Sequence, residues 1–281
     1  MTHRIFFDTS WRNIARSFAV QGVFLTKVIL GKVPGVRYLT LSTSTMSKQF
    51  LLDRTNRKII TLFVRDGVDV GTMGQVWSKD DYGLAHISRG CEISKYYDQL
   101  VCSGKTPLIL DCGANIGLAS RYFAENFPES NVVAFEPNDA NFRQALKNIE
   151  GLHIDIRNAA IGSQSGSCEV IDPGVGNAGL RVELSENGRI PIVALDDVLN
   201  SGSLSGCVPF IAKIDIEGFE RELFSANTGW VDKFPLVIIE LHDWLLPGQR
   251  TSANFLQVIS QLDRDFVYRN ENVFSIKNGR F

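Results

Sequence analysis

The stretch PLILDCGANIGLAS, residues 107–120, decides the fold prediction for this chain. Residues 108–110 are apolar and predict a buried strand, and Gly113 and Gly117 lie in a loop that leads into a helical pattern. A strand, a glycine-bearing loop and a helix usually form an anion-binding turn, because the helix N-terminus presents free backbone N–H groups. The strand nevertheless ends on Asp111, whose carboxylate stands where a phosphate would normally lie.

The same alternation of apolar runs and helical patterns continues along the rest of the chain. Runs that are buried on both faces and alternate with helices are typical of a mainly parallel sheet with helices on both faces. We therefore expect an α/β fold with strands at residues 107–111, 131–136, 152–158, 209–215, 235–242, 265–269 and 272–277. Helices are predicted at residues 92–101, 117–127, 138–149, 217–227 and 252–262, and additional short strands within residues 166–193.

Residues 1–76 are predicted to form an N-terminal extension, and residues 77–281 the main domain. In the extension, residues 48–64 (KQFLLDRTNRKIITLFV) predict a hairpin, because two apolar runs flank a polar turn. Apolar residues recur at helical spacing within residues 11–30, with arginine and lysine elsewhere on the helix. This helix either lies on an anionic membrane surface or packs against its own domain. No segment is an apolar run of the about 20 residues that a transmembrane helix requires.

The composition is that of an ordinary globular protein. Of the 281 residues, 44% are apolar and 21% are charged, which is enough apolar material to bury a core. The net charge of −2, without a run of one sign, disfavours nucleic acid as the partner, because phosphate binding needs a concentrated basic surface. The five cysteines are scattered and never spaced as CxxC, which predicts reduced thiols in a cytoplasmic protein and no zinc site.

The carboxylate of Asp111 limits which ligand the loop can bind. A pyrophosphate beside it would be repelled, and the GxGxxG fingerprint of dinucleotide sites is absent. S-adenosylmethionine has no phosphate and carries two cationic groups, an α-ammonium and a sulfonium. The next strand ends on Glu136, about 25 residues later, where nucleoside-binding folds place the acid that binds ribose hydroxyls. We therefore predict an S-adenosylmethionine site formed by Asp111, Gly113, Ala114, Asn115, Gly117, Glu136, Pro137, Asn158 and Ala160.

Within this site each part of the cofactor has an expected partner. Asp111 and the two loop glycines are assigned to the methionine part, directly or through water, and Glu136 to the ribose. Asn158 or the backbone of Ala160 is assigned to the adenine, on strand order alone. The structural alternatives are a helix-capping role for Asp111, an exposed strand-end acid at Glu136 and an ordinary turn residue at Asn158.

Two later strands end in paired ionisable residues, which predict a reaction centre. Asp215 and Glu217 stand at the end of one strand, and Glu240 and His242 at the end of the next. Residues two apart in an extended backbone project to the same face, so the four side chains converge if the strands are neighbours. Asp215 or His242 is then the base that accepts the proton of an attacking hydroxyl. The cluster could instead hold a divalent cation that acidifies the hydroxyl.

These residues also have structural interpretations. Glu217 could cap a helix that begins at Gly218, and His242 could be an ordinary strand-end histidine. Asp215 suits a structural role least, because a charge that ends a buried run is costly unless it is used. The sequence contains neither a GxSxG nucleophile elbow nor an HExxH metal motif.

Four motifs resemble the landmarks of the FkbM-type methyltransferases, which use S-adenosylmethionine: LDCGANIG (110–117), VVAFEPN (132–138), KIDIEGFE (213–220) and IIELH (238–242). The resemblance covers roughly residues 64–243, because residues 64–77 and Asp81-Tyr82 resemble the segment before the core of that family. In that segment the chain lacks the family's Thr-Ser-Asp group, and Asp81 replaces a glutamate.

The resemblance implies a class I methyltransferase core, which is a Rossmann-like sheet of seven mainly parallel strands with one antiparallel strand near the end. It also implies O-methylation of a hydroxyl on a sugar, a glycan or a related secondary metabolite. Two other functions remain open. A nicotinamide-dependent oxidoreductase is disfavoured by Asp111 and by the missing third glycine. A catalytically silent module that binds a cofactor or glycan is disfavoured by the paired acids.

Overall fold

The computed structural model describes residues 22, 37–42, 47–172 and 180–279. The chain forms two compact units, Met1–Lys79 and Asp80–Phe281, whereas the sequence places the boundary after residue 76. The segment 11–30, where a helix is predicted, lies outside the described residues except for residue 22. No helix in the described part of the chain is long and apolar enough to cross a membrane.

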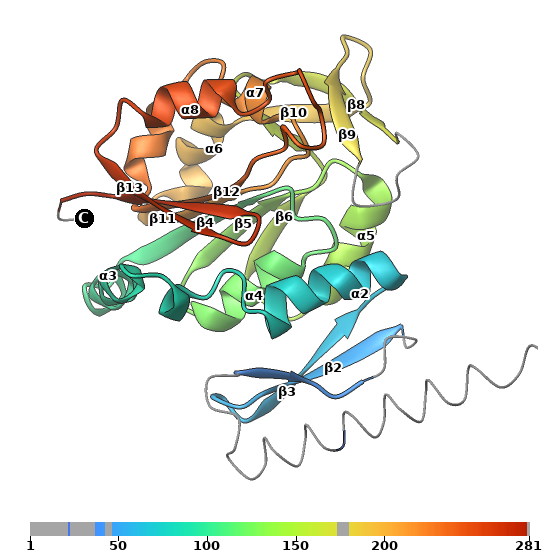
Figure 1. Cartoon of the computed structure of the whole chain (residues 1–281), viewed down its shortest axis with the longest axis vertical. Helices are drawn as coiled ribbons and strands as arrows, with labels where there is room; N and C mark the ends of the chain where they lie inside the picture. Colours follow the sequence, from blue (N-terminus) through green and yellow to red (C-terminus); the bar gives the residue numbers. More distant parts are fainter. Residues whose placement is uncertain (1–21, 23–36, 43–46, 173–179, 280–281) are drawn as a thin grey trace, which may run out of the picture. The chain divides into compact units, whose positions relative to one another are not determined.

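The described part of the first unit is a three-stranded antiparallel sheet followed by a helix (Figure 1). Its strands, in order across the sheet, are β1 (Tyr38–Thr40), β2 (Lys48–Asp53) and β3 (Lys58–Phe63). β2 and β3 pair across the polar turn that the sequence indicates, and buried Asp53 closes this turn by accepting the N–H groups of Thr55 and Asn56. Helix α2 (Gly67–Met73) and the π-helical turn η1 (Gly74–Ser78) follow.

The second unit is built on a seven-stranded sheet with the order β13-β14-β12-β11-β4-β5-β6. β12, β11, β4, β5 and β6 pair in parallel, and β14 pairs antiparallel with β12 and β13. The predicted Rossmann-like α/β fold with one reversed strand near the end is therefore confirmed. The strands are β4 (Thr106–Cys112), β5 (Asn131–Phe135), β6 (Ile154–Arg157), β11 (Cys207–Ile214), β12 (Leu236–Glu240), β13 (Arg264–Arg269) and β14 (Asn272–Lys277).

Helices cover both faces of this sheet, as Figure 1 shows. Helices α3 (Gly90–Cys102) and α4 (Leu118–Asn126) lie on one face, and α6 (Leu195–Leu199) and α8 (Ala253–Ile259) lie on the other. Helix α5 (Asp139–Asn148) connects β5 to β6. The central strands β4, β11 and β12 are apolar and mostly buried, because both of their faces are covered.

The helix predicted at residues 217–227 is much shorter in the structure. α7 spans Glu220–Leu223 and follows Phe219 rather than starting at Gly218. Glu217 and Gly218 have φ angles of 54° and 100°, left-handed values that a right-handed helix cannot contain. Glu217 therefore does not cap a helix at Gly218, and this structural interpretation is wrong. Its side chain lies instead in the turn after β11.

The second unit also contains a smaller, four-stranded sheet within residues 160–194. Its strand order is β7-β10-β8-β9, and β7 pairs in parallel with β10 so that Ala160 lies opposite Ile192. The sequence predicts short strands only within residues 166–193, so it misses β7. The strands are β7 (Ala160–Gly162), β8 (Gly166–Ile171), β9 (Arg181–Leu184) and β10 (Ile190–Ala194).

The loop after β4 approaches the backbone after β11 more closely than a side chain would allow. The Asp215 N–H donates to the carbonyl oxygen of Cys112 at 3.0 Å, which ties the two strand ends together. Gly113 has a φ of 85°, and a Cβ there would lie 1.8 Å from the carbonyl oxygen of Asp215. Only glycine fits this position. The approach brings the first predicted loop and the acidic pair after β11 to one place.

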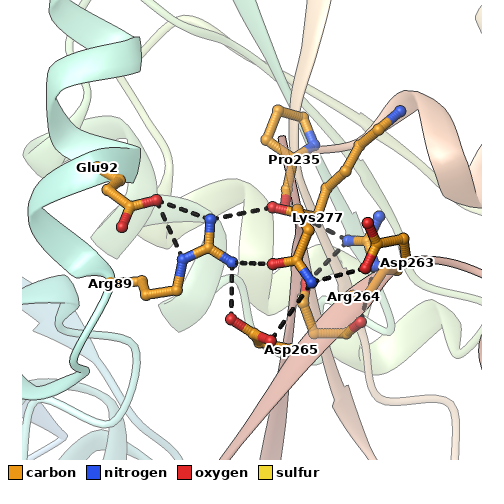
Figure 2. A network of polar contacts seen from close by, with 9 residues as sticks. Arg89, Glu92, Pro235, Asp263, Arg264, Asp265 and Lys277 are labelled. Atoms are coloured by element: carbon orange, nitrogen blue, oxygen red, sulfur yellow. Dashed lines mark hydrogen bonds and ion pairs between the residues drawn. The ribbon is translucent and has the colours of Figure 1, made fainter. Parts of the chain in front are cut away.

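Arg89 joins the start of α3 to the terminal β13–β14 hairpin at the amino end of the sheet (Figure 2). Its guanidinium donates to the Glu92 carboxylate at 2.7 Å, to Asp265 at 2.9 Å and to the Asn278 side chain at 2.6 Å. A planar guanidinium can satisfy several acceptors at once, so one side chain fixes three segments of the unit.

We expect Gly113→Ala to destabilise the protein far more than Gly104→Ala. Both glycines have a positive φ, but nothing lies within 4 Å of a Cβ at Gly104. Gly104→Ala should therefore cost about 1 kcal/mol, and Gly113→Ala at least about 2 kcal/mol more, because its methyl group overlaps backbone. Urea denaturation followed by circular dichroism measures both. Equal changes would contradict the close approach of the two loops.

Arg89→Ala should lower the urea midpoint of unfolding at least about twice as much as Arg143→Ala, because the Arg89 side chain is 17% exposed and bonds three segments, while a single exposed ion pair contributes little. Arg143 pairs with Asp139 across α5, and both side chains are exposed. A similar midpoint for the two variants would show that the network in Figure 2 does not hold the hairpin in place.

Candidate functional site

A pocket opens at the carboxyl ends of β4, β5 and β11, where open α/β sheets usually bind their ligands. Its empty volume, including the part open to solvent, is about 620 Å³, which suits a small molecule or cofactor. The start of β7 and residues of the small sheet close one side. The polar residues that line the pocket are Asn115, Glu136, Asn138, Asn141, Asp215 and Glu217.

Some of the predicted cofactor residues line this pocket and some do not. Those that line it are Gly113, Asn115, Glu136, Pro137 and Ala160. Ala114 is buried behind the loop, and Gly117 turns the chain into α4 with a φ of 77°. A Cβ on Gly117 would lie 3.1 Å from the Cβ of Ala145, so this glycine permits close packing of α4 on α5.

Asp111 lies beneath the pocket rather than in its lining. Its side chain is fully buried, forms an ion pair with Lys213 Nζ at 3.0 Å and accepts the Ser120 hydroxyl at 2.5 Å. The Lys213 ammonium also donates to the carbonyl oxygen of Gly113 at 2.7 Å. Asp111 is predicted to engage the methionine part directly or through water, and in the structure its carboxylate is paired with Lys213 and does not line the pocket.

Glu136 presents a buried carboxylate at the wall of the pocket. It accepts the backbone N–H groups of Asn115 at 2.7 Å and Asn138 at 2.8 Å. Burial raises the pKa of Glu136 to about 7, although these N–H groups favour the charged form. A carboxylate oxygen has two lone pairs, so Glu136 can also accept hydroxyl groups of a ligand.

Asn158, predicted to border an adenine, is engaged with the backbone. Its side-chain amide donates to the carbonyl oxygens of Glu136 at 2.9 Å and Pro137 at 3.2 Å. It therefore holds the end of β5 against the end of β6 and does not line the pocket. Ala160 lines the pocket, as does its neighbour Ala159, so a flat apolar ring has a surface on this side.

His242 lies at the centre of an acidic cluster formed by the ends of β11 and β12. These strands are neighbours in the sheet, and the four predicted side chains do converge. The imidazole is 1% exposed, and its Nδ1 lies 2.8 Å from Glu220 Oε1. Its Nε2 faces three further carboxylate oxygens: Asp215 Oδ1 at 3.5 Å, Glu240 Oε1 at 3.6 Å and Glu217 Oε2 at 3.7 Å.

The electrostatics of this cluster are dominated by negative charge in a partly buried place. Burial raises the pKa of Glu217 and of Glu240 well above the usual range, and the neighbouring charge of Asp215 adds to the rise. Burial alone would lower the pKa of His242, but the hydrogen bond to Glu220 and the surrounding carboxylates raise it to about 9. Asp215, Glu240 and His242 have ligand atoms within 4.8 Å of one another, a spacing that could hold a metal ion.

Sequence reasoning misses two residues of the site, Lys213 and Glu220. Lys213 precedes Asp215 by two positions, so the same-face rule that pairs Asp215 with Glu217 also selects Lys213. Glu220 belongs to the KIDIEGFE motif, but the sequence does not show that its side chain is buried beside His242. Their partners, Asp111 and His242, come from other strands, so the sequence alone does not show these contacts.

The sequence is similar to that of a known methyltransferase. A relative, the hexuronic acid methyltransferase AglP of Haloferax volcanii, is 27% identical over 165 residues, which are 56% of this chain and 67% of that protein. Among solved structures, TrmK of M. capricolum in complex with S-adenosylhomocysteine is 16% identical, with a TM-score of 0.33 and 61% of each chain covered.

A second solved structure, the magnesium protoporphyrin IX methyltransferase ChlM of Synechocystis PCC 6803 with bound SAM, is 10% identical, with a TM-score of 0.33. It covers 75% of this chain and 82% of its own. The family described as the methyltransferase FkbM domain matches residues 111–269, from the first carboxylate of the site to the end of β13. Since this match covers more than half of the sequence, the chain belongs to the FkbM methyltransferase domain family.

Proposed function

We propose that this protein transfers a methyl group from S-adenosylmethionine to a hydroxyl group of a sugar or glycan. The charge of the pocket carries the proposal. Glu136, Asp215 and Glu217 line it, and no lysine or arginine is among its described lining residues. Such a lining favours a cationic sulfonium compound and disfavours a pyrophosphate. Membership of a methyltransferase family supports the same reaction.

The residues of the pocket fit this cofactor. Asn115 Oδ1 is buried without a hydrogen-bond partner in the described structure, so it is available to accept an ammonium group. Glu136 is proposed to accept the ribose hydroxyls, and the apolar surface at Ala159 and Ala160 to contact the adenine. Asp111 acts through Lys213 rather than by touching the ligand. When bound, the cofactor supplies an activated methyl group.

The acidic cluster around His242 is proposed to receive the acceptor hydroxyl. An alcohol that attacks a methyl group must lose its proton, so a proton acceptor must lie within hydrogen-bond reach. Asp215 and His242 are the two candidates, and Asp215 also lines the cofactor pocket. His242 can accept the proton only after losing its own, because its pKa is raised to about 9. The chain would contribute mainly by aligning the hydroxyl with the methyl group and by holding that proton.

Two observations favour a sugar as the acceptor. The relative AglP is named a hexuronic acid methyltransferase. Trp244 is 65% exposed, and its ring centroid lies 6.3 Å from that of His242. An exposed aromatic ring beside a reactive cluster offers an apolar face with a polar edge, against which a sugar ring can pack. Trp244 is therefore the proposed platform for the acceptor.

Release of S-adenosylhomocysteine tests the proposed reaction. We expect release with a hexuronic acid oligosaccharide or with its neutral hexose counterpart. Asp215→Asn should lower kcat at least about 100-fold, because the group nearest both substrates is lost. Its cofactor Kd should change by less than about threefold, because a single partly exposed carboxylate contributes little to binding. Asp139→Asn is the matched control, because the Asp139 side chain is exposed on α5 and lies outside the pocket lining.

The same assay separates the alternatives. A protein that binds S-adenosylmethionine but never releases the by-product with any acceptor is a silent module. Competitive binding of NADH in place of S-adenosylmethionine would show a nicotinamide site instead. An active Asp215→Asn variant would remove Asp215 from the reaction.

Cofactor affinity should fall as the pH is lowered through about 7. The folded-state pKa of Glu136 is raised to about 7, and ribose hydroxyls donate to its charged form. Binding is therefore complete above this pH and is lost below it, by up to about tenfold per pH unit. Calorimetric titration between pH 5.5 and 8.5 measures this, and Glu136→Gln should abolish the dependence. A pH-independent Kd in the unmodified protein would exclude Glu136 as a ribose ligand.

A further inference from the structure

We propose that Asp215, Glu240 and His242 form a binding site for a divalent cation, and that Glu220 orients His242 for this purpose. The role of this cation rests on the proposed function, because the cation would activate the hydroxyl that receives the methyl group. The cation site itself is inferred from the arrangement of the side chains and does not depend on which reaction the protein catalyses.

The distances around His242 Nε2 are those of shared ligands rather than of hydrogen bonds. Its nearest carboxylate oxygens belong to Asp215 at 3.5 Å and Glu240 at 3.6 Å, whereas N–H···O bonds to carboxylates are about 2.7–2.9 Å long. Two ligand atoms that are each about 2.0–2.2 Å from one ion lie about 3.0–3.5 Å apart. His242 is 1% exposed, and its Nε2 faces the carboxylates of the cluster at 3.5 Å or more, whereas its Nδ1 makes a short hydrogen bond.

Glu220 gives the imidazole the orientation that a metal ligand needs. Its Oε1 lies 2.8 Å from Nδ1, and the Glu220 side chain is fully buried, so the contact is shielded from water. A carboxylate that accepts the N–H of one ring nitrogen fixes the orientation of the ring, and a cation that displaces the proton of the other nitrogen would meet a lone pair directed into the site. Glu220 also accepts the backbone N–H of Ile216 at 3.2 Å, which fixes the carboxylate itself.

More carboxyl groups than cationic side chains meet in this cluster. Asp215, Glu217, Glu220 and Glu240 lie around one imidazole, and the nearest lysine, Lys213, is shared with Asp111. Carboxylates that are removed from water are costly unless they are paired or bind a metal. A bound cation supplies the missing positive charge at the place where three carboxylates converge.

The donor set indicates the kind of cation. One imidazole nitrogen with carboxylate oxygens suits Mn²⁺, Co²⁺ or Zn²⁺, whereas Mg²⁺ and Ca²⁺ favour oxygen ligands alone. A cation here would lower the pKa of a coordinated sugar hydroxyl. Asp215 and His242 would then be ligands instead of bases. Glu217, whose Oε2 is 3.7 Å from Nε2, would be the carboxylate placed to take the proton.

Binding of Mn²⁺ to the chelator-treated full-length protein tests the site without cofactor or acceptor. Electron paramagnetic resonance of free Mn²⁺ should reveal one bound ion per chain, with a Kd on the order of 1 mM or lower. Glu240→Gln should abolish this binding. Glu220→Gln should weaken it by about 10- to 100-fold, because it removes the orienting carboxylate and leaves the ligands in place.

Glu129→Gln is the control, because Glu129 is an exposed glutamate just before β5, at the amino end of the sheet. Circular dichroism checks that each variant is folded. If Glu240→Gln or Glu220→Gln does not fold, His242→Asn is measured in its place and should also abolish Mn²⁺ binding. No Mn²⁺ binding, or equal binding by the unmodified protein and Glu240→Gln, would overturn the proposal. So would full methyl transfer in excess chelator, an outcome that leaves the proposed function intact. Mn²⁺ binding without methyl transfer would support the cation site and contradict the proposed function.

Discussion

The site depends on one buried ammonium group, that of Lys213. It is 2% exposed and reaches Asp111 at 3.0 Å, the Gly113 carbonyl oxygen at 2.7 Å and Asp215 at 3.4 Å. Burial alone would lower the pKa of Lys213, but Asp111 and Asp215 hold it well above its usual value. Removal of one partner would leave a buried charge uncompensated, which is strongly destabilising. Lys213 therefore keeps the cofactor loop and the acidic cluster at a fixed separation.

This contact also divides the acids of the site into two groups. Asp111 is neutralised below the floor of the pocket, so it shapes the loop without adding negative charge to the cavity. Glu136 and Glu217 remain at the surface of the pocket, where they can act on a ligand. The proposed attraction for a cationic ligand is therefore assigned to acids that the sequence analysis assigned to the ribose and to the acceptor. The charge argument for S-adenosylmethionine therefore rests on these acids, because Asp111, the carboxylate that first suggested it, does not line the pocket.

The sequence predicts strands and strand ends well, because buried parallel strands such as residues 107–111 are uninterrupted apolar runs and polar residues follow them directly. It fails where distant contacts or local backbone angles decide. The positive φ of Glu217 shortens α7, and no periodicity encodes that angle. Helix α2 is missed because GVDVGTM contains two glycines and two β-branched valines, and its stability includes the Asp66 cap. The partnership of Lys213 with Asp111 joins residues a hundred positions apart, which a local pattern cannot show.

The position of β14 has a consequence for how the second unit is made. This strand, residues 272–277, lies between β12 and β13, so the sheet receives an interior member after its edge strand has already been synthesised. During translation β12 would have an unpaired side until these residues leave the ribosome, and its apolar edge would stay open to wrong partners. Completion of the sheet, and with it a rigid support for His242 at the end of β12, therefore requires that both β13 and β14 have been synthesised. Nascent chains that stall before this point would be clients for chaperones.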